Sequence, residues 1–488
     1  MSDTTPGAAS GRPDGDVPAP DPHRWKALAV CLLAGFIVLL DVSIVNVALP
    51  SIRDGLGATE SDIQWVLSGY ALTFGLALVP AGRLGDARGR RMMFMTGLAL
   101  FTAASALCGA AQTSAWLVFA RLFQGIAGGM LTPQVSALIQ QMFRGRERGR
   151  AFGMFGTVIG ISTAVGPLAG GLLIKAFGTD EGWRWVFYVN LPIGILALVL
   201  AWRLLPGPDH ENRACLRNLD PVGIVLLGTG VVLLLLPLVE ERQWKGSAKW
   251  LLIPVAIAFL AAFVAWETRY AKRAMPLVDL GLFKIRSYTL GLLVMIFYFA
   301  GFTSIFFVFT LYLQSGLGYS ALLAGLTITP FAVGSAVGAA LGGHMVNRFG
   351  RALVVVGLVM VAIGLTGSIF AVYEVPGHHV GWALVAPLLF AGVGSGFVIA
   401  PNQTLALAEV PAAQGGSAGG VLQTGQRIGS AMGIAAVGAI FFSRLAEDGG
   451  RDWAGPLRHG LVASVAFVLA ALLVAALDLR HGRVPLKR

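Results

Sequence analysis

The sequence predicts an all-α membrane protein whose chain crosses the bilayer fourteen times. Hydrophobic residues make up 56% of its 488 residues and charged residues only 12%, whereas a soluble protein carries about a quarter charged residues. Apolar runs long enough to cross a hydrocarbon core of about 30 Å recur along the whole chain, separated by short breaks. These runs lack the alternation of barrel strands, and only helices or closed barrels satisfy the backbone in lipid.

The expected spans follow one another with short connections. In chain order they cover residues 26–48, 63–82, 92–111, 115–140, 151–176, 184–204, 221–239, 250–268, 288–313, 320–343, 352–373, 382–405, 418–442 and 459–479. Residues 1–24 precede them and are rich in Pro, Gly and Asp, which is typical of a disordered tail. They show no convincing cleavage site, so we expect the first span to remain in the mature protein.

Basic residues gather at the ends of the expected spans rather than on one soluble face. The net charge of +11 would suit a nucleic-acid partner, but this placement argues against that class. With residue 1 in the cytoplasm, most of the 36 Lys and Arg residues fall in cytoplasmic segments. This excess is typical of the inner side of a bacterial inner membrane, so we expect both termini there.

Two similar basic turns divide the chain into related halves. Residues 82–91 and residues 343–351 each join two expected spans on the cytoplasmic side and carry glycines among basic residues. The second copy has Asn347 where the first has Asp86. A turn that recurs in each half is typical of a duplicated transporter, whose two bundles rock against each other around a central site.

Five stretches together resemble the major facilitator superfamily, and in particular its fourteen-helix drug/proton antiporter branch. They are residues 82–91 between the second and third spans, 40–50 in the first span, 121–125 in the fourth, 166–171 in the fifth and 183–192 at the start of the sixth. The resemblance implies export of an amphipathic, drug-like compound, driven by inward proton flow.

The same resemblance implies how the spans are grouped. Residues 25–204 and 286–480 would form two six-helix bundles, residues 205–285 an inserted helix pair with its linkers, and residues 481–488 a cytoplasmic tail. The inserted pair is nearly free of charge within its spans, which suits a peripheral position.

Asp41 and Arg121 are the expected proton-coupling residues. Asp41 is the carboxylate that lies well inside an expected span, where an acidic side chain costs at least about 2.5–3.5 kcal/mol. A low dielectric disfavours its charged form, so it can bind and release a proton in each cycle. Arg121 is the expected relay partner or counter-charge, as the resemblance also implies. In the alternative, Asp41 only hydrogen-bonds a neighbouring helix and Arg121 reaches the outer interface.

Polar and aromatic residues of both halves are expected to line the substrate cavity. They are Asn46, Gln124, Tyr298, Phe302, Asn402, Gln423, Gln426 and Arg427. Tyr298 and Phe302 begin an aromatic stripe that could hold a planar or cationic compound, although lipid would accept the same stripe. Arg427 has no acid in its own helix, and Glu409 is a candidate partner. Cavity lining and a structural ion pair are therefore both open for Arg427.

Two glycine-containing segments are expected to control conformational change. Gly82, Asp86 and Arg90 belong to the first basic turn, where a carboxylate can cap a helix or pair with an arginine as a latch. Gly166, Pro167, Gly170 and Gly171 concentrate bending and small residues in the fifth span. The alternatives are an ordinary basic turn and ordinary close packing.

The chain carries no pattern that indicates an enzyme. We find no phosphate-binding loop, no catalytic triad and no cofactor motif, and Cys31, Cys108 and Cys215 are too scattered for disulfides or a metal site. We therefore expect no cofactor and no metal, with a proton gradient as the energy source. The expected partners are protons, a small amphipathic substrate and the lipid bilayer, and the expected state is a monomer.

Two other functions remain open at this point. An exporter of one dedicated metabolite, lipid or self-made antibiotic would share every motif. A membrane sensor that transports nothing is the second alternative.

Overall fold

The computed structural model describes residues 22–178, 180–207, 220–239, 244, 246–274, 276–375, 377–447 and 452–481. These residues form helices and no strand, and fourteen segments are long and apolar enough to cross a membrane. The predicted all-α fold with fourteen spans is therefore confirmed. Cys215 and most of the two predicted tails, 1–24 and 481–488, lie outside the described residues.

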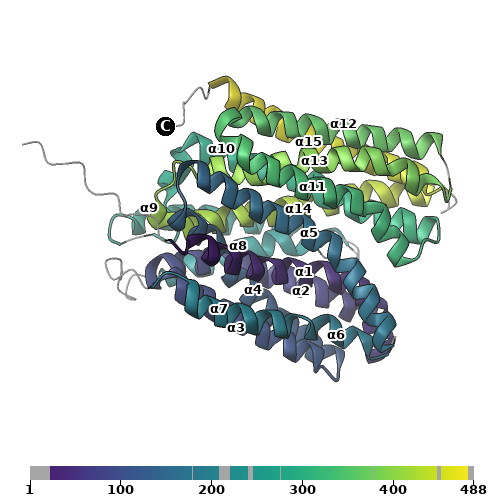
Figure 1. Ribbon diagram of the computed structural model, residues 1–488, viewed down its shortest axis with the longest axis horizontal. Helices are drawn as coiled ribbons and strands as arrows, with labels where there is room; N and C mark the ends of the chain where they lie inside the picture. The colour runs from purple at the N-terminus through teal and green to yellow at the C-terminus, as the bar shows by residue number, and fades with distance from the viewer. Residues whose placement is uncertain are drawn as a thin grey trace, which may run out of the picture.

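The N-terminal half contributes six spans, coloured purple to blue in Figure 1. Its helices are α1 (Arg24–Leu56), α2 (Glu60–Arg88), α3 (Arg90–Gly109), α4 (Ser114–Met142), α5 (Gly145–Phe177), α6 (Gly182–Tyr188) and α7 (Asn190–Leu204). Helices α6 and α7 together form one span.

The C-terminal half contributes six more spans, which form a second bundle (Figure 1). Its helices are α10 (Arg286–Leu311), continued by the π-helical turn η5 (Tyr312–Gly316), then α11 (Ala321–Phe349), α12 (Arg351–Glu374), α13 (Val380–Ala406), the short η6 (Ala412–Gln414), α14 (Gly415–Glu447) and α15 (Ala454–His481). One cluster of buried apolar side chains fills the N-terminal bundle and continues onto Tyr288 of α10 and Leu422 of α14, and a second cluster fills the C-terminal bundle.

Local sequence signals set where several helices begin and end. Thr59 caps α2, because its hydroxyl accepts a hydrogen bond from the Asp62 backbone N–H at 3.2 Å while the Asp62 carboxylate accepts one from the Thr59 N–H at 2.9 Å. At both repeated turns a glycine with positive φ separates two helices, at +107° for Gly89 and +53° for Gly350. These glycines let α2 turn into α3, and α11 into α12, within one residue.

The two halves meet most closely at the end of the molecule where α1 begins and α15 ends, which we call the termini end. Figure 1 shows the bundles diverging away from this end. Among the described residues, the hydrogen bonds between halves all lie on the termini-end side of the spans. They join Asp86 to Gly416 and Ser417, Arg90 to Ala412, Arg148 to Leu407, Asn347 to Arg146, Gln403 to Ser136, Gln423 to Thr132 and Ser136, and Thr157 to Ala336. This conformation is therefore closed at the termini end.

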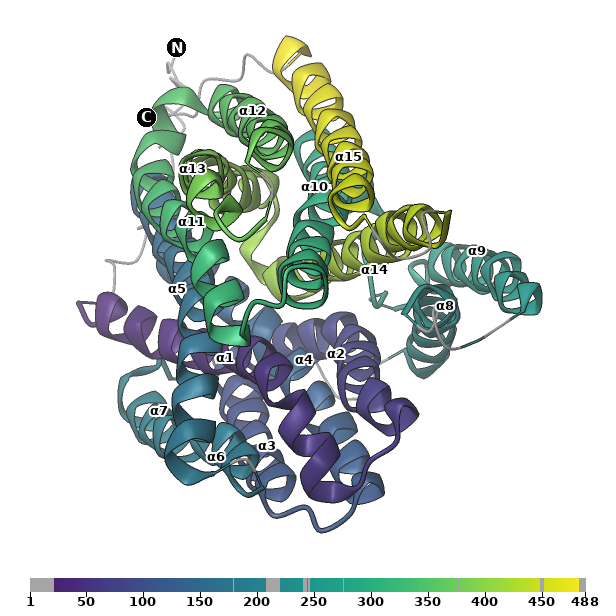
Figure 2. The same ribbon diagram turned by 90° about the vertical axis from the view of Figure 1, so that its right-hand side faces the viewer.

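The remaining two spans lie beside the bundles. They are α8 (Pro221–Val239) and α9 (Leu252–Tyr270), flanked by the short helices η3 (Ser247–Leu251) and η4 (Leu280–Lys284). The two helices pack on each other, and α8 also packs on α2 and α14. Figure 2 shows the pair at the edge of the molecule.

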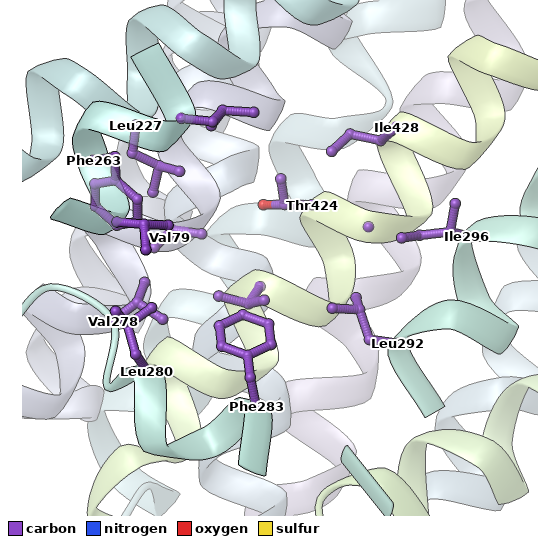
Figure 3. Close-up of a pocket in the computed structure, with 14 residues that line it drawn as sticks. Val79, Leu227, Phe263, Val278, Leu280, Phe283, Leu292, Ile296, Thr424 and Ile428 are labelled. Carbon is purple, nitrogen blue, oxygen red and sulfur yellow. The ribbon is translucent and has the colours of Figure 1, made fainter. Parts of the chain in front are cut away.

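A pocket of about 200 Å³ separates this pair from the bundles (Figure 3). Its walls are apolar side chains of α2, α8, α9, α10 and α14, among them Val79, Phe263 and Ile296, and Thr424 supplies the one hydroxyl. On α14 the pocket therefore takes one helix face, while Gln423, Gln426 and Arg427 belong to other faces.

Candidate functional site

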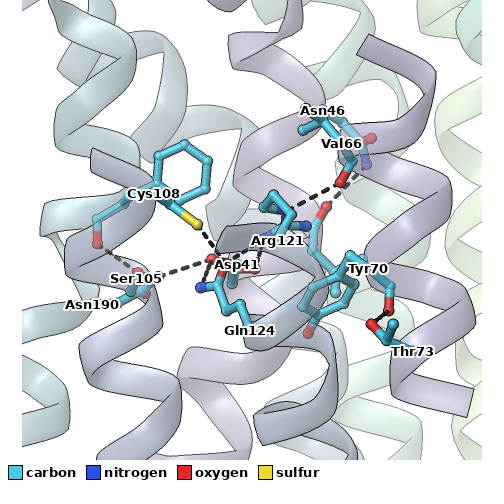
Figure 4. Close-up of polar contacts among 12 residues, drawn as sticks. Asp41, Asn46, Val66, Tyr70, Thr73, Ser105, Cys108, Arg121, Gln124 and Asn190 are labelled. Carbon is cyan, nitrogen blue, oxygen red and sulfur yellow. Dashed lines mark hydrogen bonds and ion pairs between the residues drawn. The ribbon is translucent and has the colours of Figure 1, made fainter. Parts of the chain in front are cut away.

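A buried polar cluster lies inside the N-terminal half, where α1, α3, α4 and α7 approach one another (Figure 4). At its centre Asp41 of α1 is completely buried. Arg121 Nη1 donates to Asp41 Oδ2 at 2.6 Å, Gln124 Nε2 donates to Oδ1 at 2.9 Å and Asn190 Nδ2 donates to Oδ1 at 3.0 Å. The carboxylate thus has one cationic and two amide partners, as a buried charge requires.

Arg121 is held as tightly as its partner. Its side chain is 1% exposed, Nη1 also donates to Gln124 Oε1 at 2.7 Å, and Nε donates to the Val66 carbonyl at 3.2 Å. The guanidinium carbon lies 4.1 Å from the centre of the Tyr70 ring, which adds a cation–π contact. Arg121 therefore does not reach toward the membrane interface, and the ion pair with Asp41 is the geometry that the counter-charge hypothesis requires.

A second layer of polar groups orients the first. Asn190 Nδ2 also donates to Ser105 Oγ at 3.0 Å, and Ser105 Oγ donates to the Phe187 carbonyl at 2.9 Å. Cys108 donates to Gln124 Oε1 at 3.4 Å. Asn190 was missed as a site residue, although residues 183–192 belong to a recognised stretch. Its position at the break between α6 and α7 was the signal that could have found it.

The C-terminal half holds its buried charge differently. Arg427 of α14 is half-buried, and its guanidinium carbon lies 4.3 Å from the centre of the Phe74 ring on α2. It makes no hydrogen bond or ion pair with any residue that the structure describes. The suggested pairing with Glu409 is wrong, since Glu409 is exposed in the turn after α13 and interacts electrostatically with Arg351 instead.

The other expected cavity residues fall into two groups. Asn46 is exposed, and Gln426 and Phe302 are half-buried. Tyr298 and Asn402 are completely buried instead. Asn402 accepts from Arg351 Nη1 at 2.6 Å and donates to the Gly291 carbonyl at 2.9 Å, so it joins helices within its own bundle.

The aromatic stripe of α10 and Gln423 also make contacts within the protein. Tyr298, Phe302, Phe306 and Phe331 form a chain of ring contacts with centroids 5.1–5.8 Å apart. Gln423 is 6% exposed and donates to the Thr132 carbonyl at 3.5 Å across the two halves. In this conformation Tyr298 and Gln423 are packed inside the protein, whereas Phe302 and Phe306 remain partly exposed.

Asp86 joins the two halves at the termini end. Its carboxylate accepts from the backbone N–H of Gly416 at 3.0 Å and of Ser417 at 2.8 Å, and from Ser417 Oγ at 3.0 Å. It therefore caps the first turn of α14, where a negative charge is favourable. Arg90 pairs with Asp86 at 2.9 Å and also reaches the Ala412 carbonyl. A Cβ at Gly82 would overlap the Gly416 carbonyl oxygen, so glycine is required for this approach.

The second basic turn mirrors the first. Asn347 on α11 donates to the Arg146 carbonyl at 3.3 Å, close to the start of α5. A Cβ at Gly149 of α5 would lie 2.8 Å from the Gly343 carbonyl oxygen. Each turn thus contacts the beginning of a helix in the opposite half, with a charged cap in one copy and a neutral amide in the other.

The glycines of α5 differ in what surrounds them. A Cβ at Gly166 would overlap the Ser43 hydroxyl of α1, and one at Gly170 would lie 3.1 Å from Ile44 Cγ1. Nothing lies within 4 Å of a Cβ at Gly171. Pro167 sits within the helix and faces α11, because a Cβ at Gly325 would lie 3.2 Å from it.

The structure also buries two carboxyl groups that sequence reasoning missed. Asp220 and Glu267, at the termini-end side of α8 and α9, are 2% and 0% exposed. Trp266 Nε1 donates to Asp220 at 2.8 Å, the Leu277 N–H donates to Glu267 at 3.1 Å, and both carboxyl groups lie against Gly223, where a Cβ would overlap Asp220 Oδ2 and lie 2.7 Å from Glu267 Oε1. The interiors of the two spans carry no charged residue, as expected, and the two buried carboxyl groups lie at their ends.

The protein has one six-helix bundle in each half, with charged side chains buried inside the spans. This architecture is that of a membrane transporter and not of an enzyme. The sequence model of the Major Facilitator Superfamily matches residues 31–434. The chain therefore belongs to the Major Facilitator Superfamily.

Relatives of this chain are named for antibiotic export and resistance. It is 41% identical over 445 residues to the probable actinorhodin transporter of Streptomyces coelicolor, covering 89% of this chain and 76% of the relative. It is 35% identical over 467 residues to the puromycin resistance protein pur8 of Streptomyces alboniger, covering 94% and 91%. It is 31% identical over 469 residues to the tetracenomycin C resistance and export protein of Streptomyces glaucescens, covering 94% and 85%.

Solved structures share the fold. The human organic anion transporter MFSD10 aligns with a TM-score of 0.70 at 15% identity, covering 93% of this chain and all of that one. The proton:xylose symporter XylE aligns with a TM-score of 0.65 at 16% identity, covering 94% and 96%. At these identities the likeness concerns the architecture alone.

Proposed function

We propose that the protein is a proton-coupled antiporter that exports amphipathic, drug-like compounds across the bacterial inner membrane by alternating access. The observation that carries the proposal is the buried contact between Asp41 and Arg121, with Gln124 and Asn190 on the same carboxylate. The names of the relatives support the direction and the kind of cargo. Both termini are cytoplasmic in this proposal, and the working unit is a monomer.

Protonation of Asp41 is the step that links proton entry to movement. A protonated Asp41 no longer balances the charge of Arg121, which is 1% exposed and has no other acidic partner in the described residues. A buried cation that has lost its partner costs several kcal/mol. Because Val66 and Tyr70 of α2 also hold Arg121, the strain acts on the contacts among α1, α2 and α4. Proton binding therefore favours a different arrangement of these helices.

We infer the position of this step in the transport cycle from the closed termini end. The termini end is closed by Asp86, Arg90 and their partners on α14 and η6. With cytoplasmic termini, this is the state that faces outward, in which cargo leaves and Asp41 takes up a proton. After the cytoplasmic end opens, Asp41 releases its proton to the cytosol. New cargo then enters from the cytosol or the inner leaflet.

The proposal is tested by transport in proteoliposomes that contain the full chain. Amphipathic dyes and antibiotics, puromycin among them, are loaded on the cytoplasmic face and an inward proton gradient is imposed. Asp41→Asn should lower gradient-driven transport by about 100-fold or more, because the loss of one buried charge partner is worth several kcal/mol. Asp54→Asn is the matched control, since Asp54 lies on the same helix with a side chain that is 69% exposed.

Two results would contradict the proposal. Cargo could move equally well after both the pH difference and the voltage are collapsed, or Asp41→Asn could transport at the rate of Asp54→Asn. Absence of any transport by the unaltered chain would instead support a membrane sensor.

A narrower cargo range is the second candidate, favoured by relatives that are each named for one antibiotic. In that case the same chemistry serves one dedicated compound. Growth inhibition profiles with and without expression separate the two, because a dedicated exporter protects cells from one member of the panel.

A further inference from the structure

Arg427 is a cation near the middle of the protein that has no acidic partner among the described residues. It lies twelve residues into α14, half-buried, with its guanidinium carbon 4.3 Å from the centre of the Phe74 ring. No described residue accepts a hydrogen bond from its five N–H groups. An arginine at this depth is costly and is expected to have a partner. The partner is missing from the part of the chain that the structure describes.

A second polar group close to Arg427 is also unsatisfied. Tyr70 of α2 is 3% exposed, and its hydroxyl has no hydrogen-bond partner. The Arg121 guanidinium carbon lies 4.1 Å from the centre of its ring, and that ring lies 5.8 Å from the Phe74 ring, over which Arg427 is placed at 4.3 Å. One tyrosine thus connects the proton-coupling pair with the unpaired cation.

The balance of charge inside the membrane is positive at this place. Among the described residues, the charged side chains well inside the spans are Asp41, Arg121 and Arg427. Asp41 and Arg121 neutralise each other at 2.6 Å, and Arg427 remains. A cationic compound would add a second unpaired positive charge, whereas an anion would supply the missing partner.

We propose that the exported compound is an anion, and that its negative group binds Arg427 and the Tyr70 hydroxyl. Arginine presents a planar fork of donors to a carboxylate, and such charge-assisted hydrogen bonds are stronger than neutral ones. This inference rests on the proposed export function and names the chemical class of its cargo. It departs from the expectation of a planar or cationic compound.

The charge of the cargo changes how the voltage drives transport. A proton that enters and an anion that leaves both shift positive charge inward, so an inside-negative potential drives both movements. With a cation as cargo the two movements cancel for one proton per cycle. Anion export should therefore respond to voltage alone, without a pH difference.

The test uses three probes that differ only in charge. One dansyl-labelled alkyl chain ends in a carboxylate, in a primary amide or in a trimethylammonium group. Transport is measured with the full chain in proteoliposomes under an imposed voltage, and binding is measured by dansyl fluorescence with the protein in detergent. We expect the carboxylate probe to bind about tenfold more tightly than the ammonium probe and to be exported by voltage alone.

Variants of α14 assign the preference to one residue. Arg427→Gln should weaken carboxylate binding about tenfold and leave binding of the amide probe unchanged. Arg427→Lys keeps the charge and should retain part of the preference. Arg444→Gln is the control, because Arg444 is 49% exposed and pairs with Glu447 in the same helix.

The outcomes separate this inference from the proposed function. Preference for the ammonium probe, or carboxylate binding that is unchanged in Arg427→Gln, would overturn the anion site while leaving proton-driven export intact. Carboxylate binding that depends on Arg427, without transport under any gradient, would support the site and count against the export function.

Discussion

The two halves of the molecule treat a buried arginine in opposite ways. Arg121 is paired with Asp41 at 2.6 Å and is 1% exposed, whereas Arg427 is half-buried and has no acidic partner among the described residues. Both guanidinium groups stack on rings of α2, at 4.1 Å from Tyr70 and 4.3 Å from Phe74. These rings are one helical turn apart. The comparison shows that an acid neutralises the buried arginine in one half and that no described acid does so in the other, and our two proposals assign proton coupling to the first and cargo binding to the second.

The largest expected loss of stability follows from changing Arg121, the arginine that is paired with Asp41. Arg121→Gln leaves Asp41 buried without its cation, so we expect the free energy of unfolding to fall by about 3–5 kcal/mol. The double variant Asp41→Asn with Arg121→Gln should recover part of that loss, because two amides can hydrogen-bond each other. Thermal unfolding in detergent measures both. If Arg121→Gln alone were as stable as Arg444→Gln, Asp41 and Arg121 would not stabilise each other, and the prediction would be wrong.

A smaller loss of stability is expected at the two basic turns. The first turn has an acid, Asp86, where the second has the neutral Asn347, just as Arg121 has an acidic partner and Arg427 has none among the described residues. Asp86→Asn weakens the cap on α14, and we expect the closed contact to lose about 1–3 kcal/mol. Asn347→Ala should cost less, because it removes one neutral hydrogen bond of 3.3 Å. The readout is the labelling rate of a cysteine introduced for Ser136, which is completely buried between the halves. Equal labelling in both variants would contradict the comparison.

The smallest loss of stability is expected from changing Arg427, which has no acidic partner among the described residues. Arg427→Gln removes a cation that leaves no acid behind, so the free energy of unfolding should change by no more than about 1 kcal/mol. The same thermal unfolding assay measures it, next to Arg121→Gln. A loss as large as that of Arg121→Gln would reveal an acidic partner for Arg427 and would break the comparison.

The sequence was sufficient for features that depend on local chemistry. The spans follow from apolar length, and Asp41 and Arg121 stood out because charge inside hydrocarbon is rare. That the two meet could be expected, but the roles of Gln124 and Asn190 as amide partners of Asp41 depend on how α4 and α7 pack on α1. Periodicity along one helix does not specify which neighbour faces it.

The misses have two physical reasons, and the first is that depth along a helix is easily misjudged. Glu409 ends up at the termini end, while Arg427 lies twelve residues into α14, or about 18 Å along the helix axis. Asp220 and Glu267 lie at the ends of expected spans, where water would solvate them. The second reason is tertiary contact at the helix ends: the Leu277 N–H of the following linker donates to Glu267, and Trp266 Nε1 donates to Asp220. Folding of a linker over a helix end leaves no mark in the hydrophobic pattern.

The cap on α14 has one more consequence for the cycle. The oxygens of Asp86 accept from two successive amides, Gly416 and Ser417, and this geometry can be met in a single alignment of the two halves. An apolar contact would allow the two halves to slide along each other by about an ångström or two. A carboxylate that accepts from two consecutive N–H groups does not allow this, because hydrogen bonds require a narrow range of distances and angles. In the proposed cycle the two halves would therefore return to the same alignment each time this end closes, so that every turnover would restart from one structure.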